Sequence, residues 1–191
     1  MMKTLVLAVA MIVSVSAQAY NTVGESIFAS QLAQIESSIH TLGLNWKVGE
    51  ENNYSLNMGG FLKGTMKMSV REITADGAWL VQDVDLSIQK QKIEILIDLN
   101  TGVIKKMLVN GKEQAPPKTD FEVIDQKEDH ITVPAGAFDC IYLKVKDKAN
   151  KDAITEQWVN PRDIPLSGMV KSLADSQLGK VTIELVSFKK L

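Results

Sequence analysis

Hydrophobic and polar residues alternate with a period of two over most of the chain after Gly43. Between residues 61 and 71 every second side chain is apolar or small, and those between are mostly polar or charged. Successive side chains of a strand point to opposite faces of a sheet, so this pattern predicts a half-buried strand. Asp76-Gly77 and Asn110-Gly111 are tight-turn signals between further alternating runs. Residues 61–109 therefore predict a four-stranded antiparallel meander.

The second half of the chain repeats the same two-residue period with more interruptions. Further strands are predicted near residues 121–125, 129–133, 138–146, 153–159 and 180–190. Residues 112–120 contain Pro116-Pro117 among polar neighbours, and proline cannot donate a ladder hydrogen bond inside a sheet. We expect a linker there, and about nine or ten strands in total.

Two segments show the longer period of a helix. Thr22 and Glu25 have the spacing of a capping box, and a one-sided apolar stripe follows them up to Gly43. The stripe consists of Phe28, Leu32, Ile35, Ile39 and Leu42. Residues 164–178 have apolar side chains at roughly helical spacing, with Gly168 among them. The sequence thus predicts an N-terminal amphipathic helix and a short second helix.

Two helices cannot cover nine or ten strands that each have one apolar face, so the sheet must curl around its own apolar side. The predicted fold is mainly β (α+β): a strongly curved antiparallel sheet or unclosed β-barrel, with both helices capping the concave face. The candidate ligand-binding residues that would line this face are Leu62, Met66, Met68, Leu80, Val84, Ile95 and Ile97. The methionines fit either a deformable pocket or the filling of a core.

The first nineteen residues have the pattern of a secretory signal peptide. Lys3 precedes an apolar run from Leu5 to Val13, and Ala17-Gln18-Ala19 supplies small residues for cleavage before Tyr20. The run is shorter than the roughly 20 residues of a spanning helix, and position 20 is not a cysteine that could carry a lipid. We therefore predict an exported protein with one domain over residues 20–191 and no transmembrane anchor after cleavage.

Composition and charge limit the classes of molecule that the chain can bind. The chain has 21 basic and 23 acidic residues and a formal net charge of −2, with the basic residues spread among the acidic ones. Nucleic-acid binding would require a concentrated basic patch, so no nucleic-acid partner is expected. The single cysteine excludes an internal disulfide. We expect a monomer.

The residues with catalytic potential do not form a recognisable constellation. His40 and His130 lack partners at metal-ligand spacing, so neither a metal nor a cofactor is expected. Cys140 alternates with apolar residues on one strand, a pattern typical of a small buried side chain. Asp83 and Asp85 share one strand face and fit either an acid–base pair or a solvated surface. The sequence predicts no catalytic residue and no enzyme.

Three motifs in the C-terminal half carry a resemblance to known proteins. They are Val133-Pro134-Ala135-Gly136-Ala137-Phe138-Asp139-Cys140, Glu156-Gln157-Trp158-Val159 and Ile164-Pro165-Leu166-Ser167-Gly168-Met169-Val170-Lys171. Over residues 44–191 the chain resembles uncharacterised bacterial secreted proteins that are similar to the LolA and LolB type of lipoprotein carriers. The resemblance implies an unclosed β-barrel around an apolar cavity in a Gram-negative periplasm, and it assigns no binding or catalytic residue.

These observations favour a non-enzymatic periplasmic protein that binds an apolar ligand, a lipid or an acylated or apolar polypeptide, in a half-barrel cavity. The alternative is a cell-envelope interaction module with a dry core and no ligand, whose sheet edge or strand face contacts another protein.

Overall fold

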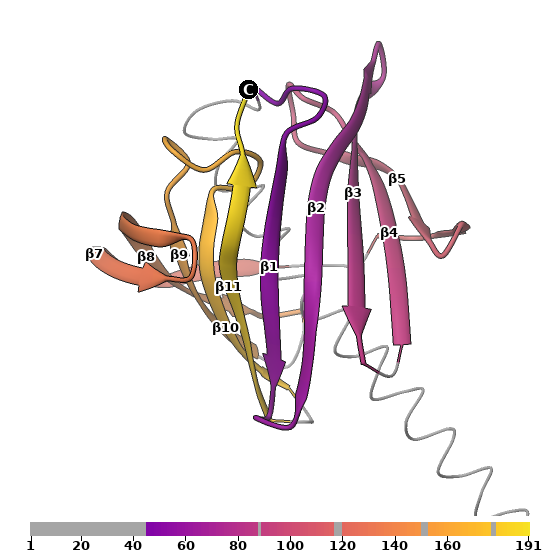
Figure 1. Cartoon of the computed structure of the whole chain (residues 1–191). Coiled ribbons are helices and arrows are strands. Elements are labelled where there is room, and N and C mark those ends of the chain that lie inside the picture. The colour runs from indigo at the N-terminus through magenta and orange to yellow at the C-terminus, as the bar shows by residue number, and fades with distance from the viewer. Residues whose placement is uncertain (1–44, 88, 117–119, 150–152, 177–178) are drawn as a thin grey trace, which may run out of the picture.

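The computed structural model describes residues 45–87, 89–116, 120–149, 153–176 and 179–191, and within them all strands form one antiparallel sheet (Figure 1). The sheet has 11 strands in the order β6-β5-β4-β3-β2-β1-β11-β10-β9-β8-β7. The bounds are β1 Glu51–Met58, β2 Leu62–Thr74, β3 Gly77–Leu86, β4 Gln89–Ile97, β5 Ile104–Val109, β6 Lys112–Gln114, β7 Phe121–Val133, β8 Gly136–Asp147, β9 Ala153–Val159, β10 Met169–Ser176 and β11 Gly179–Lys189. The sheet is not closed into a barrel, and β6 and β7 are its edges.

Two meanders make up this sheet and meet at its centre. Within β1–β6, and again within β7–β11, strands that are consecutive in the sequence pair with each other. The first and last strands, β1 and β11, then pair antiparallel and join the two halves. Asn110 and Gly111 both have positive φ, which is the geometry of the tight hairpin turn that their sequence predicts.

The sheet curls strongly at its β7–β8 end. The backbone N–H of Ala135, in the turn between these strands, donates to the carbonyl of Leu185 on β11 over 3.1 Å. The rings of Phe138 and Phe188 also meet edge to face, with centroids 6.3 Å apart. Three strands separate β7 from β11 in the sheet order, so these contacts require the sheet to fold back on itself. Figure 1 shows β7 and β8 lying across the direction of β1 and β11.

One face of the sheet, which we call the inner face, holds most of the core. The register aligns Tyr54 with Met66 and Val84 across β1, β2 and β3, and Leu80 with Ile95 across β3 and β4. The largest fully buried side chains are Tyr54, Leu56, Met58, Met66, Met68, Leu80, Ile95, Ile97, Ile164, Met169 and Ile183. Charged pairs such as Lys67–Glu51 and Lys171–Glu184 lie on the opposite, outer face. The period of two in the sequence therefore places apolar residues on the inner face and charged residues on the outer face.

Residues 160–168, which we call the turn segment, lie against the inner face at β1. The side-chain amide of Asn52 donates to the carbonyl of Pro165 over 2.9 Å, and the indole N–H of Trp46 donates to the carbonyl of Leu166 over 3.2 Å. Gly168 closes the segment with φ of 70°, and a Cβ there would lie 2.7 Å from the Cα of Pro161. The close approach and the positive φ both require glycine at this position.

The predicted meander over residues 61–109 is confirmed as β2 to β5, and the strands near 138–146, 153–159 and 180–190 are confirmed as β8, β9 and β11. The strand count of nine or ten was too low. The linker over 112–120 includes the short strand β6, and the two strands near 121–133 are one strand, β7, with a register shift between Val123 and Asp125. β1 was missed, because Asn52 interrupts its apolar phase.

The second helix, over residues 164–178, is wrong. This stretch contains the end of the turn segment and then strand β10. The register shifts between Met169 and Lys171, so that the successive residues Met169 and Val170 are both buried. Such a β-bulge places adjacent apolar residues on the buried side and imitates helical spacing. The predicted N-terminal helix and the signal peptide lie outside the described residues.

Candidate ligand-binding face

The seven predicted lining residues lie together on the inner face of β2, β3 and β4. Alternation places those of each strand on one side, and the register joins Met66 to Val84 and Leu80 to Ile95. Leu62 is partly buried, and the other six are at most 5% exposed. The structure thus assembles the apolar surface that the sequence pattern predicts, while binding of a ligand to it stays a prediction.

A polar pair interrupts this apolar surface. Met68 pairs with Asn52 on one side and with Gln82 on the other, so these three residues form one row across β1, β2 and β3. Asn52 is fully buried, and Gln82 is 1% exposed. The amide nitrogen of Asn52 donates to Tyr54 Oη over 3.0 Å as well as to Pro165, and that of Gln82 faces Met66 Sδ at 3.1 Å. Their amide oxygens have no hydrogen-bond partner among the described residues.

Buried charge in the described part of the chain is entirely negative. The buried charged residues are Glu50, Glu94 and Asp147, and none is lysine or arginine. Each carboxylate has its own partner: Glu50 accepts the backbone N–H of Lys47, Glu94 pairs with an arginine, and Asp147 accepts backbone N–H groups near it. The described residues therefore offer no buried cation to an anionic ligand.

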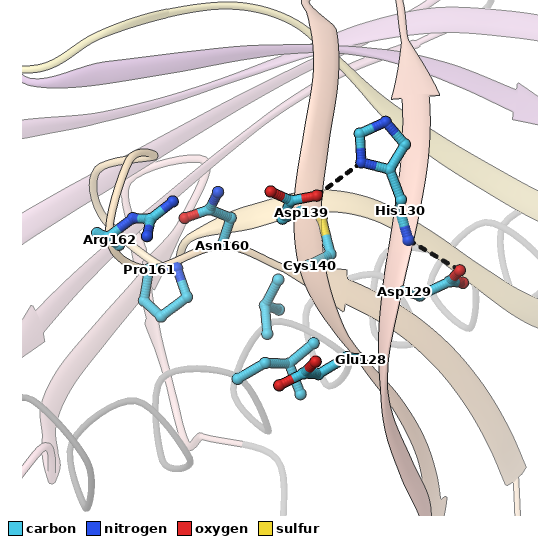
Figure 2. Close-up of a pocket in the computed structure, with 10 residues that line it drawn as sticks. Glu128, Asp129, His130, Asp139, Cys140, Asn160, Pro161 and Arg162 are labelled. Carbon is cyan, nitrogen blue, oxygen red and sulfur yellow. Dashed lines mark hydrogen bonds and ion pairs between the residues drawn. The ribbon is translucent and has the colours of Figure 1, made fainter.

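A second feature, a pocket of about 640 Å³, lies at the β7–β9 end beside the start of the turn segment (Figure 2). Its lining includes Glu128, His130, Asp139, Ile141, Val159 and Arg162. Strand pairing forms one row across β8, β9, β10 and β11, which consists of Leu143, Gln157, Ser172 and Ile183. Because Ile183 lies on the inner face, this end of the sheet belongs to the inner face too. Figure 2 shows the His130 ring directed toward Asp139 across the β7–β8 ladder, with Nδ1 and Oδ1 2.7 Å apart.

The chemistry of this pocket does not match a nucleophilic site. Burial raises the pKa of the Cys140 thiol to about 11, and the nearby Asp129 and Asp139 carboxylates add to the rise. The thiol is therefore protonated at neutral pH and is a poor nucleophile. Asp129 accepts a hydrogen bond of 2.7 Å from the indole N–H of Trp158, which lowers the pKa of Asp129.

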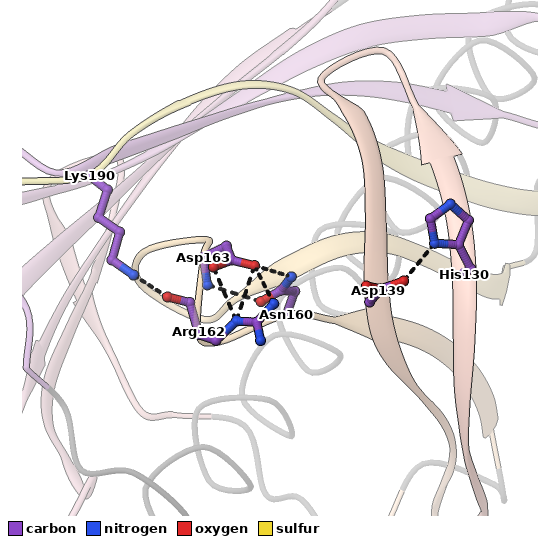
Figure 3. A network of polar contacts seen from close by, with 6 residues as sticks. All are labelled: His130, Asp139, Asn160, Arg162, Asp163 and Lys190. Atoms are coloured by element: carbon purple, nitrogen blue, oxygen red, sulfur yellow. Dashed lines mark hydrogen bonds and ion pairs between the residues drawn. The ribbon is translucent and has the colours of Figure 1, made fainter.

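Polar contacts hold the start of the turn segment in place (Figure 3). Asn160 and Asp163 exchange two hydrogen bonds of 2.9 Å. The guanidinium of Arg162 binds Asp163 and lowers the pKa of that carboxyl, and Lys190 donates to the carbonyl of Arg162. This network ties the turn segment to the end of β11.

The remaining sequence candidates lie on exposed surfaces. Asp83 and Asp85 face outward on β3, where Lys90 forms an ion pair of 2.7 Å with Asp85. His130 is exposed and has Asp139 as its partner, and no group of three potential metal ligands occurs among the described residues. His40 lies outside them. The same part of the chain contains no helix long and apolar enough to span a membrane.

Sequence reasoning missed Asn52 and Gln82. The available signal was Gln82 itself, a polar residue in the apolar phase of β3 between Leu80 and Val84. Neither the turn-segment network nor the row across Met68 has a comparable signal, because both depend on register between strands that are distant in sequence.

Comparisons with known proteins give distant likenesses. No family model and no curated protein matches the chain. A solved structure from Parabacteroides distasonis, provisionally described as a lipoprotein, matches with a TM-score of 0.40 and 13% identity, over 76% of this chain and 97% of its own. A DUF1329 family protein from Desulfovibrio piger matches with a TM-score of 0.33 and 11% identity, over 88% and 92%. At these TM-scores neither likeness carries an argument about function.

Proposed function

We propose that this chain is a non-enzymatic periplasmic protein that holds an apolar ligand, a lipid or an acylated or apolar polypeptide, on the inner face of its curved sheet. The observation that carries the proposal is the gathering of the seven apolar residues on one face of β2 to β4. A sheet with one apolar face must bury that face against something. Six of the seven residues are at most 5% exposed, and the turn segment reaches the inner face at β1.

The side chains of the inner face suit a ligand of variable shape. Met66 and Met68 are two residues apart on β2, Met58 lies on the same face of β1 opposite Leu62, and each of the three is at most 1% exposed. Methionine has three flexible side-chain torsions and adapts to irregular apolar surfaces. Burial of apolar surface contributes about 25 cal/mol per Å², so an acyl chain lying along this face would be held without any polar contact.

A pair of tryptophan substitutions on adjacent residues of β2 tests the proposal. Leu62 points to the inner face and Lys63 to the outer face. Leu62→Trp should fill part of the binding space and reduce uptake of a neutral fluorescent probe such as Nile red at least fivefold. Lys63→Trp adds the same side chain outside and should leave uptake unchanged. Equal uptake by both variants and the unsubstituted protein would contradict a site on the inner face.

The alternative function, an interaction module with a dry core, makes the opposite prediction in the same experiment. A dry core takes up no probe, and organic extraction of the purified protein then yields no lipid. The open edge at β7, where Val123 and Ile124 are 52% and 46% exposed, is the surface that this alternative would use.

A further inference from the structure

Several buried polar side-chain atoms of the described residues have no hydrogen-bond partner, among them the hydroxyl of Ser172 on β10. Two of these atoms are amide oxygens on neighbouring positions of β1 to β3: Asn52 Oδ1 and Gln82 Oε1, on side chains that are at most 1% exposed. Leaving a buried polar group unpaired costs about 1–3 kcal/mol, so native proteins pair nearly all such groups with protein, water or ligand. Two orphan oxygens on one apolar face indicate that a bound molecule supplies donors there.

Their positions define one place rather than two. Asn52 and Gln82 flank Met68 in a single row of the sheet, and neighbouring strands are about 4.8 Å apart. The two Cα atoms are therefore about 10 Å apart, with side chains that extend from the same face. The orientation of Asn52 is fixed, because its nitrogen already donates to Tyr54 and Pro165. Its oxygen thus remains an acceptor.

The charge of the interior limits the group that can pair with these oxygens. A carboxylate or phosphate head accepts hydrogen bonds and would meet two amide oxygens, and no lysine or arginine is buried in the described residues to compensate its charge. Burial of an unpaired anion is far more costly than burial of a neutral polar group. A hydroxyl or amide N–H supplies the missing donors without charge.

We propose that the ligand of the inner face is a neutral amphiphile whose head carries hydroxyl or amide N–H donors, bound head-inward at Asn52 and Gln82. This inference rests on the proposed function and adds the polarity of the ligand to it. The apolar chain then lies along Met66 and Val84 toward Leu62, which is the less buried end of the predicted lining.

Three probes with the same fourteen-carbon chain test the inference by displacement of Nile red. Monomyristoyl glycerol carries hydroxyl donors, methyl myristate is neutral but has none, and myristate is an anion. We expect monomyristoyl glycerol to bind at least tenfold more tightly than methyl myristate, which corresponds to one hydrogen bond of about 1.4 kcal/mol. Myristate should bind most weakly. Equal binding of all three, or preference for myristate, would overturn the inference and leave the proposed function standing.

A variant separates a hydrogen-bonding role of Gln82 from a packing role. Gln82→Met keeps a flexible side chain of similar length and removes the orphan oxygen, so the protein should fold with an unchanged or higher Tm. The preference for monomyristoyl glycerol over methyl myristate should fall about tenfold. Asp83→Met places the same side chain at the adjacent residue, which is exposed on the outer face, and should leave that preference unchanged.

The remaining outcomes are also decisive. If no probe displaces Nile red and the dye itself does not bind, the proposed function fails and the inference fails with it. If the dye binds but Gln82→Met keeps the full preference, only the role of this row fails. A crystal structure with monomyristoyl glycerol in which ordered waters, rather than the ligand, pair with both oxygens would likewise overturn the inference.

Discussion

Strands β2 and β7 are both 13 residues long, yet they differ in almost every other property. β2 lies between β1 and β3 and buries Met66, Met68 and Val70 on the inner face. β7 pairs with β8 alone and buries, of its own residues, Val133 at its end. A strand of the same length thus forms part of the buried apolar face in one case and a solvent-exposed edge of the sheet in the other.

The difference follows from the number of neighbours that each strand has. A central strand such as β2 is paired on both sides and packs one face on the core, so buried and exposed residues alternate along it. An edge strand exposes a row of N–H and C=O groups, and charged side chains on it discourage pairing with another chain. β7 carries Glu122, Asp125, Lys127, Glu128 and Asp129. A ligand site is therefore expected at the centre of the sheet, and protection against aggregation at its edge.

The largest expected effect comes from truncating one side chain in each strand. Met68 is fully buried and Val123 is 52% exposed. Met68→Ala should lower the free energy of unfolding by about 2–5 kcal/mol, because it removes buried atoms and leaves a cavity. Val123→Ala should lower it by less than about 0.5 kcal/mol. Urea denaturation of both variants measures the difference, and equal losses would remove the contrast between centre and edge.

A smaller effect tests whether the turn segment is held in a fixed conformation against the inner face. Gly168→Ala would place a Cβ 2.7 Å from Pro161 at a positive φ, and should cost about 1–3 kcal/mol in unfolding free energy. Gly111 also has a positive φ, of 78°, but nothing lies within 4 Å of an added Cβ. Gly111→Ala is thus the matched control for φ alone. A loss no larger in Gly168→Ala than in the control would show that the segment is free to move.

The sequence predicted strands β2 to β5 better than the β7–β10 end of the sheet. In β2 to β5 each strand follows its neighbour through a short turn, so local alternation and the Asp-Gly and Asn-Gly signals were sufficient to place them. At β10 a bulge puts Met169 and Val170 on the buried side together, and a one-residue shift in register is invisible to a periodicity argument. The helix expected there was a consequence of that shift.

The candidate site, too, was predictable from the sequence only in part. The apolar lining was predictable, because its residues repeat within single strands. The row of Asn52, Met68 and Gln82 was not, because pairing across three strands decides which polar residue meets which. The pocket at the β7–β9 end was not predictable either, because its lining comes from residues 128–130, 139–141 and 159–162, which strand pairing brings together.

The thiol of Cys140, on β8 beside the edge strand, tests whether that region is chemically inert. Its pKa is raised from 9.0 to about 11, so the folded protein keeps the proton that the unfolded chain loses. The contribution to stability is complete below about pH 9 and is lost as the pH rises toward 11. The unfolding free energy of the unsubstituted protein should therefore fall more steeply over this range than that of Cys140→Ala. Alkylation by iodoacetamide at pH 8 should be at least tenfold slower in the folded than in the unfolded protein, and rapid alkylation would reveal a reactive thiol.

The smallest effect is expected for the ion pair between His130 and Asp139, which joins β7 to β8. Its side chains are 62% and 84% exposed, so solvent screens the attraction and the pair should add almost nothing to stability. The measurement is a double-mutant cycle with His130→Ala, Asp139→Ala and the double variant, at low ionic strength and again in 0.5 M salt. The cycle should give a coupling energy below about 0.5 kcal/mol at low ionic strength and none above error in 0.5 M salt. A strong coupling that survives salt would mean that the two groups are shielded from water. The β7–β8 end would then be a preorganised polar site rather than a solvent-exposed edge.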